Sequence, residues 1–334
     1  MKLISVEDLD DVLGSVVAKD DYTGSRVLPF VELAQENYLI EEIGLEFFEV
    51  LIVYADTNVN ELDPVKYDPL MERVKKVVVW GTYLEYLFFS LGQDTASGIV
   101  ETVGEHSKPV RIGVLDERKK RAKINLGKEI DRLMAFLFRK RADFVEWTET
   151  GSATESLGLF VRSGVELGKA LPESFGSYWL WKRMKQNMLQ MTNEVLLPVL
   201  GEELLSKVKD GLENDNLVEP YKELRKLCAN YLSVYVYVYI LPSLSVVMTE
   251  GGSLRVLSEF DGINNAKSAT EEQMNRLLAG LDKQTRDALN AIMKYLKEND
   301  TDIAEYTLPV SDISDLMKKP PFMRNREKKW VFGL

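Results

Sequence analysis

A short stretch in the first third of the chain has the residue types of a calcium-binding loop. DTNVNELDPVKY begins at Asp56 and places Asp56, Asn58 and Asn60 at the first, third and fifth positions of such a loop. The sixth position requires glycine for a sharp turn and is Glu61, and the twelfth requires a bidentate glutamate and is Tyr67. Because the stretch lacks its hinge and its strongest ligand, the sequence predicts a polar connector without a specific metal site.

A second acidic loop lies at the corresponding place further along the chain. Residues 210–219 contain several carboxylates without the spacing of metal ligands. Acidic loops at 56–68 and 210–219 are typical of exposed connectors, although carboxylates also bind Mg²⁺. A carboxylate-dependent or metal-dependent enzyme that uses these loops is therefore an alternative function, and whether they bind a divalent ion stays open.

The other residue types that perform catalysis form no recognisable active site. The chain contains one histidine, His106, and one cysteine, Cys228. His106 lies in a predicted turn, and Cys228 lies in a predicted buried helix, where a cysteine is typically a small apolar residue. The glycine-rich phosphate-binding motifs and the GxSxG motif are missing from the sequence. The sequence thus predicts no catalytic residue, no cofactor and no metal ion, and the chain is not expected to be an enzyme.

Charged side chains stand out at further places. Glu85 interrupts the apolar run YLEYLFF and is expected to face a basic residue or an interface, with a catalytic or channel role as the alternative. The basic clusters ERKKRAK (117–123) and RKR (139–141) are interpreted as a solvated helix face with complementary charge nearby.

The C-terminal stretch KKPPFMRNREKKW (318–330) combines six basic residues with aromatic ones. Aromatic residues and arginine are enriched at the cores of protein interfaces. The sequence therefore predicts that this extension docks, on the molecule itself or on a neighbour. The residues predicted to dock are Phe322, Met323, Arg324, Arg326, Trp330 and Phe332.

Composition indicates an acidic globular protein. The chain has 334 residues, a length that allows about two domains. Of these residues 45% are hydrophobic, and the net charge is −11. Because binding to phosphates depends on clustered lysine and arginine, recognition of nucleic acid is not expected. The acidic N-terminal stretch MKLISVEDLDDVLGS is unlike a secretion signal, and it predicts a short helix capped by Ser5.

The chain repeats itself over four blocks that recur in the same order. Gly44 aligns with Gly201 in the first block, and Pro69 aligns with Pro220 in the second. Chance could produce one such block, but four in order indicate an internal duplication. The aligned blocks are 31–52 on 188–209, 68–92 on 219–243, 99–107 on 246–254 and 116–140 on 271–295.

The run NYLSVYVYVYIL (230–241) has the alternation of a strand and lies in an uncharged segment long enough for a membrane helix. Its counterpart in the first copy, YLEYLFFS (83–90), contains Glu85 and does not alternate. The sequence therefore predicts a buried helix over 221–240 and no membrane span.

These patterns predict a mainly α protein, formed by tandem duplication of a helical-bundle domain in which each copy carries a small β-hairpin. The hairpins are expected over 97–112 and 244–257, the latter turning at Gly251-Gly252. The stretch TETGSATESLG is rich in Ser, Thr and Gly and predicts a linker. The expected organisation is a first copy at 1–147, a linker at 148–157, a second copy at 158–300 and a docking extension at 301–334.

The repeated unit resembles a known group of sequences. AQENYLIEEIGLE (34–46), its looser echo TNEVLLPVLGEEL (192–204) and the helix, hairpin and long helix that follow resemble an uncharacterised family of Bacteroidetes and their phages. The unit is in turn similar to the helical head–tail connector, or adaptor, proteins of tailed phages, which form rings, usually twelvefold, between the portal and the tail. Adaptors commonly carry one copy of the unit, whereas this chain carries two.

The resemblance implies a ring-forming structural protein of the virion at the head–tail junction, made in the cytoplasm of the bacterial host. Its expected partners are further copies of itself and the portal and tail proteins, and it carries over no catalytic residue. The alternatives are the enzyme described above and a helical protein-interaction module that is not part of a virion. The ring stoichiometry, and which copy faces the portal, stay open.

Overall fold

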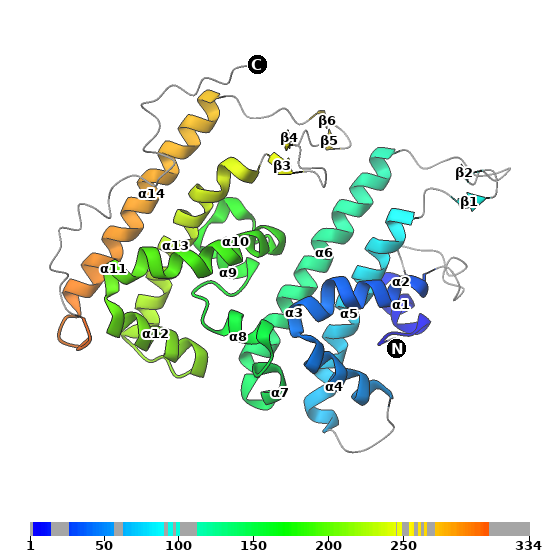
Figure 1. Cartoon of the computed structure of the whole chain (residues 1–334), viewed down its shortest axis with the longest axis horizontal. Coiled ribbons are helices and arrows are strands. Elements are labelled where there is room, and N and C mark those ends of the chain that lie inside the picture. The colour runs from blue at the N-terminus through cyan, green and yellow to red at the C-terminus, as the bar shows by residue number, and fades with distance from the viewer. Residues whose placement is uncertain are drawn as a thin grey trace. The chain divides into compact units, whose positions relative to one another are not determined.

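The computed structural model is mainly helical and divides into two compact units (Figure 1). Unit 1 comprises Met1–Leu157 with Glu259–Ala266, and unit 2 comprises Gly158–Ser258 with Lys267–Leu334. The residues that the structure describes are 3–14, 27–56, 63–89, 93–95, 98–100, 112–244, 246–248, 254–256, 260–261, 264–265 and 271–306.

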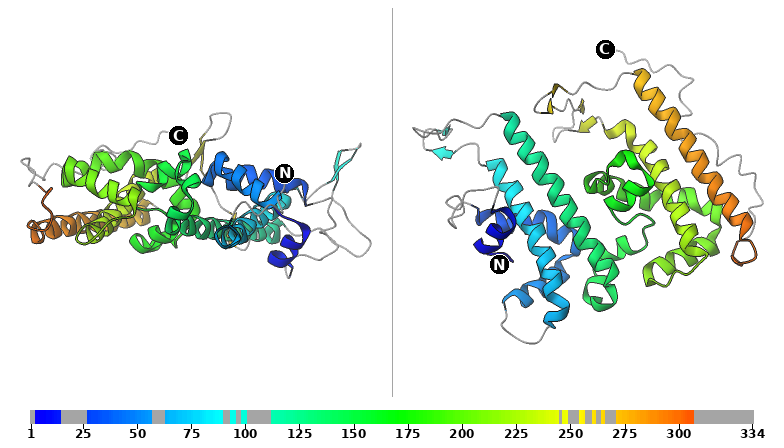
Figure 2. Two further views of the ribbon diagram at one scale, coloured as in Figure 1. Left: turned by 90° about the horizontal axis from the view of Figure 1, so that it is seen from below. Right: turned by 180° about the vertical axis from the view of Figure 1, so that it is seen from behind.

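Unit 1 is organised around one pair of long helices, α5 and α6. Figures 1 and 2 show these two helices side by side and antiparallel, with α2 crossing α5. The helices of unit 1 are α1 (Val6–Leu13), α2 (Pro29–Ala34), π-helix η2 (Gln35–Ile40), α3 (Glu41–Ile43), α4 (Leu45–Asp56), α5 (Pro64–Phe89), α6 (Ile112–Arg139), 3₁₀-helix η3 (Arg141–Asp143), α7 (Val145–Thr148) and α8 (Gly151–Leu157).

The first helix begins as the sequence predicts. The Ser5 hydroxyl accepts a hydrogen bond from the backbone N–H of Asp8, and the Asp8 carboxylate accepts one from the backbone N–H of Ser5, which forms a capping box. Asp8 also forms an ion pair with Lys75 of α5, with 2.8 Å between Oδ1 and Nζ. The cap therefore starts α1, and the ion pair joins it to the central helix of the unit.

Helix α5 is surrounded by other parts of unit 1. Val77, Val78 and Val79 occupy three consecutive positions, which point in different directions around a helix, and each is 0% exposed. Such all-round burial is typical of a central helix in a bundle. It explains why the apolar run shows no amphipathic pattern.

Unit 2 is built around the antiparallel pair α13 and α14, with α9 and α10 packed against α13 (Figures 1 and 2). Its helices are α9 (Gly164–Ala170), 3₁₀-helix η4 (Pro172–Ser174), α10 (Tyr178–Met191), π-helix η5 (Thr192–Leu196), α11 (Leu197–Leu200), α12 (Glu202–Asn214), α13 (Tyr221–Leu244) and α14 (Glu271–Glu298).

The alternating Val-Tyr run lies in a helix, as predicted. Helix α13 buries Val234, Val236 and Val238, whereas Tyr239 is 43% exposed. Valine has a modest helix propensity, so the packed surroundings of α13 favour the helix more than its own sequence does. Within the described part of the chain, no helix is long and apolar enough to cross a membrane.

The duplication is visible in the backbone. In each copy a π-helix, η2 or η5, precedes a short α-helix that ends at a glycine with positive φ. Gly44 has φ 84° and Gly201 has φ 78°, and each accepts a hydrogen bond from the backbone N–H four residues later, at Phe48 and Leu205. Because π-helices are rare, their recurrence at aligned positions supports the internal repeat independently of residue identity.

The linker predicted over 148–157 is wrong, because these residues are folded into unit 1. Trp147 and Ala153 are each 0% exposed, and helix α8 spans most of the predicted linker. Thr150 is 2% exposed, and its side chain packs so closely on Gly44 that a Cβ atom at Gly44 would lie 2.8 Å from it. The small residues of this segment allow close packing. A prediction from composition alone cannot tell such a segment from a flexible linker, because both are rich in small residues.

The boundary predicted at residue 300 is too early. Ile303 is 0% exposed and Tyr306 is 9% exposed, so the segment after α14 contributes to the core of unit 2. The docking residues predicted at 322–332 lie outside the described residues.

Three short antiparallel pairs of strands complete the described structure. They are β1 (Gln93–Thr95) with β2 (Gly98–Val100), β3 (Val246–Met248) with β4 (Leu254–Val256), and β5 (Phe260–Asp261) with β6 (Asn264–Asn265). The predicted turn at GEHSKP, which includes His106, lies outside the described residues. One small hairpin per copy therefore stays a prediction.

Candidate functional site

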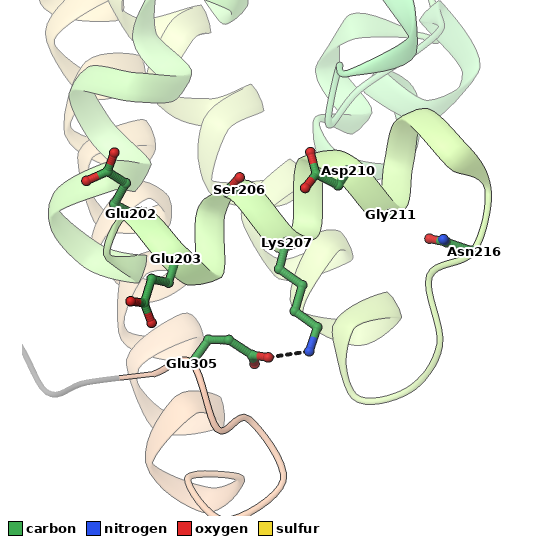
Figure 3. Close-up of a pocket in the computed structure, with 8 residues that line it drawn as sticks. All are labelled: Glu202, Glu203, Ser206, Lys207, Asp210, Gly211, Asn216 and Glu305. Atoms are coloured by element: carbon green, nitrogen blue, oxygen red, sulfur yellow. Dashed lines mark hydrogen bonds and ion pairs between the residues drawn. The ribbon is translucent and has the colours of Figure 1, made fainter.

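A groove on α12 of unit 2 is lined by several carboxylate side chains (Figure 3). It has a volume of about 890 Å³ and is open to solvent. We call it the acidic groove, and it is lined by Glu202, Glu203, Ser206, Lys207, Asp210, Gly211, Asn216 and Glu305.

The periodicity of α12 places these side chains on one face. Glu203, Ser206 and Asp210 follow one another at intervals of three and four residues, which is the spacing of one helix face. Leu204 and Val208 lie on the opposite face and are buried in unit 2. The amphipathic pattern of α12 thus fixes which residues can reach the groove.

Glu305 is held in place by two side chains. Its carboxylate forms an ion pair with Lys207 and accepts a hydrogen bond from it (Figure 3). It accepts a second hydrogen bond, of 2.7 Å, from the Tyr221 hydroxyl. The hydrogen bond from Lys207, followed by that from Tyr221, lowers the pKa of Glu305 to about 2. The cluster ties the segment after α14 to α12 and α13, and it neutralises the single lysine of the groove.

The remaining carboxylates of the groove carry uncompensated charge. Glu202, Glu203 and Asp210 form no ion pair within the described part of the chain. Among the described residues, no three His, Cys, Asp or Glu side chains lie close enough together to hold a metal ion. Carboxylates without an ion-pair partner can bind cationic side chains, through carboxylate–ammonium and carboxylate–guanidinium contacts.

Glu85 of unit 1, predicted to face a basic residue or an interface, is buried and has two neutral hydrogen-bond partners. Its Oε1 accepts a hydrogen bond of 2.6 Å from the Tyr38 hydroxyl and one of 3.3 Å from the Asn37 amide. Burial raises the pKa of Tyr38, and the hydrogen bond to Glu85 raises it further. In the second copy the aligned positions are Val195 and Val236, both buried, so this polar contact belongs to the first copy alone.

The two predicted acidic loops differ in what their described residues contact. In the first loop, residues 57–62 lie outside the described residues. Tyr67 occupies the twelfth position of the calcium-loop pattern; it is 1% exposed and stacks on Tyr54, with 5.0 Å between the ring centroids. Asp68 accepts a hydrogen bond from the Tyr54 hydroxyl. Tyr67 therefore contributes to the core, whereas Asp68 is exposed and accepts a hydrogen bond at the surface.

The second predicted acidic loop contributes to the acidic groove, but its first half is helical, because α12 extends to Asn214. Asp210 and Asn216 of the predicted stretch 210–219 line it. The prediction missed Glu202, Glu203 and Glu305, although the face of α12 could have indicated the first two. No local pattern indicates Glu305, because it reaches the groove from 98 residues away in the chain.

The single cysteine is a core residue, as predicted. Cys228 is 0% exposed in α13, and burial raises the pKa of its thiol. A thiol that stays protonated and buried is a poor nucleophile.

Comparison with known proteins identifies one family. The model of the family of unknown function DUF6712 matches residues 40–156 and 196–311. No curated protein and no solved structure matches the chain. The two matches cover most of the chain, and they include residues 148–156 of the segment predicted as a linker and the residues that follow α14 up to 311. The chain belongs to the family of unknown function DUF6712 and contains two copies of its unit in tandem.

Proposed function

We propose that the protein is a structural component of a tailed-phage virion, a ring-forming head–tail connector or adaptor between the portal and the tail. In this proposal it is not an enzyme and it acts through surface contacts. The contacts are those of helix faces, of a small hairpin in each copy and of the extension with Phe322, Met323, Arg324, Arg326, Trp330 and Phe332. The sequence resemblance described above and the exposed surfaces of the described residues support it.

An aromatic surface at the end of α5 is the observation that carries the proposal. Phe88 and Phe89 are 53% and 61% exposed, and the ring of Phe89 lies 5.2 Å from the ring of Phe30 in α2. Lys119 of α6 lies over Phe88, with 4.6 Å between Nζ and the ring centroid. Neighbouring exposed aromatic side chains are typical of surfaces that bind another protein.

Acidic charge is compatible with a position near packaged DNA. A net charge of −11 repels the phosphate backbone and favours passage of the duplex over binding to it. The charge therefore suits a connector through which DNA moves.

The mass of the purified protein in solution tests the proposal. We expect light scattering to show a discrete ring for the full chain, and a lower mass for a chain that lacks residues 318–334 or carries Phe88→Ser with Phe89→Ser. Phe175→Ser is the matched control, because Phe175 is 93% exposed in unit 2 and lies outside this surface. A full chain that stays monomeric at high concentration and in the presence of the portal protein would contradict the proposal.

A further inference from the structure

A second groove, in unit 1, has the opposite charge. It lies between α5 and α6 and has a volume of about 330 Å³. Four cationic side chains and two carboxylates line it, although the chain as a whole is acidic. We call it the basic groove, and its lining residues are Glu72, Arg73, Lys76, Glu129, Arg132, Ala135, Phe136 and Arg139.

The two carboxylates of the basic groove are already paired within their own helices. Lys76 binds Glu72 at 2.7 Å, and Arg132 binds Glu129. Each pair uses one cation, so two guanidinium groups have no carboxylate partner among the described residues. One of them, Arg73, donates a hydrogen bond to the backbone carbonyl of Pro69.

The other two arginines carry the net positive charge of the groove. Arg73 lies over the ring of Phe136, with 4.4 Å between the guanidinium carbon and the ring centroid, and forms no ion pair within the described part of the chain. Arg139 is exposed and also has no carboxylate partner among the described residues. Guanidinium groups bind carboxylates through two parallel hydrogen bonds, so the groove is suited to an acidic surface.

The shared fold does not require this charge. In the repeat alignment, Arg73, Lys76 and Arg132 fall on Leu224, Leu227 and Asp287 of the second copy. Both copies build the same pair of long helices, so the helices pack without the basic residues. Three of the four cations of the basic groove are therefore specific to the first copy, whereas Arg139 falls on Lys294, which keeps the positive charge.

We propose that the basic groove of one molecule binds the acidic groove of a second copy of this chain. The charge spacings match: Arg132 and Arg139 are seven residues apart on α6, and Glu203 and Asp210 are seven residues apart on α12. Seven residues correspond to about 10 Å along a helix and return to the same face. Two helices lying alongside each other can thus place both arginines beside both carboxylates. Arg132 binds Glu129 through Nη1 alone, and its other N–H groups can donate to a carboxylate of the second molecule.

The contact joins different surfaces of the two molecules, so it is heterologous. Each molecule offers a basic groove in unit 1 and an acidic groove in unit 2, and a third molecule can bind the free groove of either partner. Such head-to-tail contacts close into rings or continue as filaments. The inference names the subunit contact of the proposed ring and in that respect rests on the proposed function.

Charge reversal tests the contact. Arg132→Glu with Arg139→Glu makes both grooves acidic, and Glu203→Lys with Asp210→Lys makes both basic. We expect each double variant to associate at least about tenfold more weakly than the unaltered chain. Mixing the two variants should restore assembly, because the reversed groove of each then meets a groove of opposite charge on the other. Sedimentation velocity at low salt measures the mass in all three cases.

Arg276→Glu with Lys294→Glu is the matched control. It makes the same change of charge on exposed positions of α14, where Lys294 is the aligned counterpart of Arg139. Assembly of this control should equal that of the unaltered chain, and circular dichroism should show all variants folded.

The outcomes separate the contact from the function. A discrete ring that survives both double reversals, or a mixture that does not reassemble, would overturn the proposed contact and leave the ring function standing. Open filaments that depend on the two grooves would support the contact and contradict a ring. A chain that is monomeric at low salt and high concentration overturns the contact, and binding to the portal protein then decides the function separately.

Discussion

At the scale of single residues, the two copies differ in their buried and partly buried polar contacts. Glu85 with Tyr38 in the first copy corresponds to two buried valines in the second, and Glu305 in the second copy forms a three-residue cluster with Lys207 and Tyr221. A buried or partly buried carboxyl group needs hydrogen-bond donors, and in both copies those donors come from other elements. The polar contacts therefore depend on the packing that brings those elements together.

The titration of Glu305 provides a test of the cluster. Its carboxyl should titrate near pH 2 in an NMR experiment, below its ordinary value of 4.5. Because the pKa is lower in the folded chain, the cluster stabilises unit 2 above the ordinary value, and this contribution is lost as the pH falls through about 2. Lys207→Met should raise the midpoint more than Tyr221→Phe does, since the lysine has the larger effect. Equal midpoints in all three proteins would show that the cluster does not form in solution.

At the scale of elements, the repeat conserves backbone geometry more closely than side chains. A π-helix, a short α-helix and a glycine with positive φ precede α4 and α12 at aligned positions. The glycines have ψ of 151° and 166°, a region that other residues rarely adopt. The surroundings differ, because Gly44 packs on Thr150 whereas no atom lies within 4 Å of the position where a Cβ of Gly201 would be.

Alanine at the two glycines should therefore separate strain from packing. Gly201→Ala should destabilise unit 2 by about 1–3 kcal/mol, which is the cost of a strained backbone conformation. Gly44→Ala adds a collision with Thr150 at 2.8 Å and should destabilise unit 1 more. Chemical denaturation measures both changes, and Gly280→Ala, in open space on α14, is the control. A smaller effect at Gly44 than at Gly201 would contradict the packing described here.

At the scale of the whole molecule, each unit holds segments that the sequence assigns to connections. Unit 1 includes α7 and α8, and unit 2 includes the residues that follow α14 up to Tyr306. The two matches to the family also extend over these segments, to residues 156 and 311. The unit that is duplicated is thus longer than its long helices.

Truncation of the chain tests where the second unit ends. A chain that ends at residue 306 should unfold like the full chain, whereas one that ends at residue 300 loses Ile303 and Tyr306 from the core. Burial of one such side chain contributes about 1.5–3 kcal/mol, so unit 2 should be destabilised by at least about 2 kcal/mol. Hydrogen exchange read by mass spectrometry distinguishes the two units, and unit 1 serves as the internal control. Equal protection of unit 2 in both truncated chains would place the boundary at residue 300.

The sequence by itself determined the helical class, the duplication, the cap of α1 and the buried helix α13. These features depend on neighbours within a few residues or on a comparison of the chain with itself, so they can be recognised from the sequence alone. The tertiary structure alone decided the partners of Glu85, the packing of residues 148–157 and 301–306, and the two grooves. Lys207 with Glu305, and Arg73 with Arg139, come from separate elements. Only the packing of those elements determines which charges share a surface and which remain unpaired.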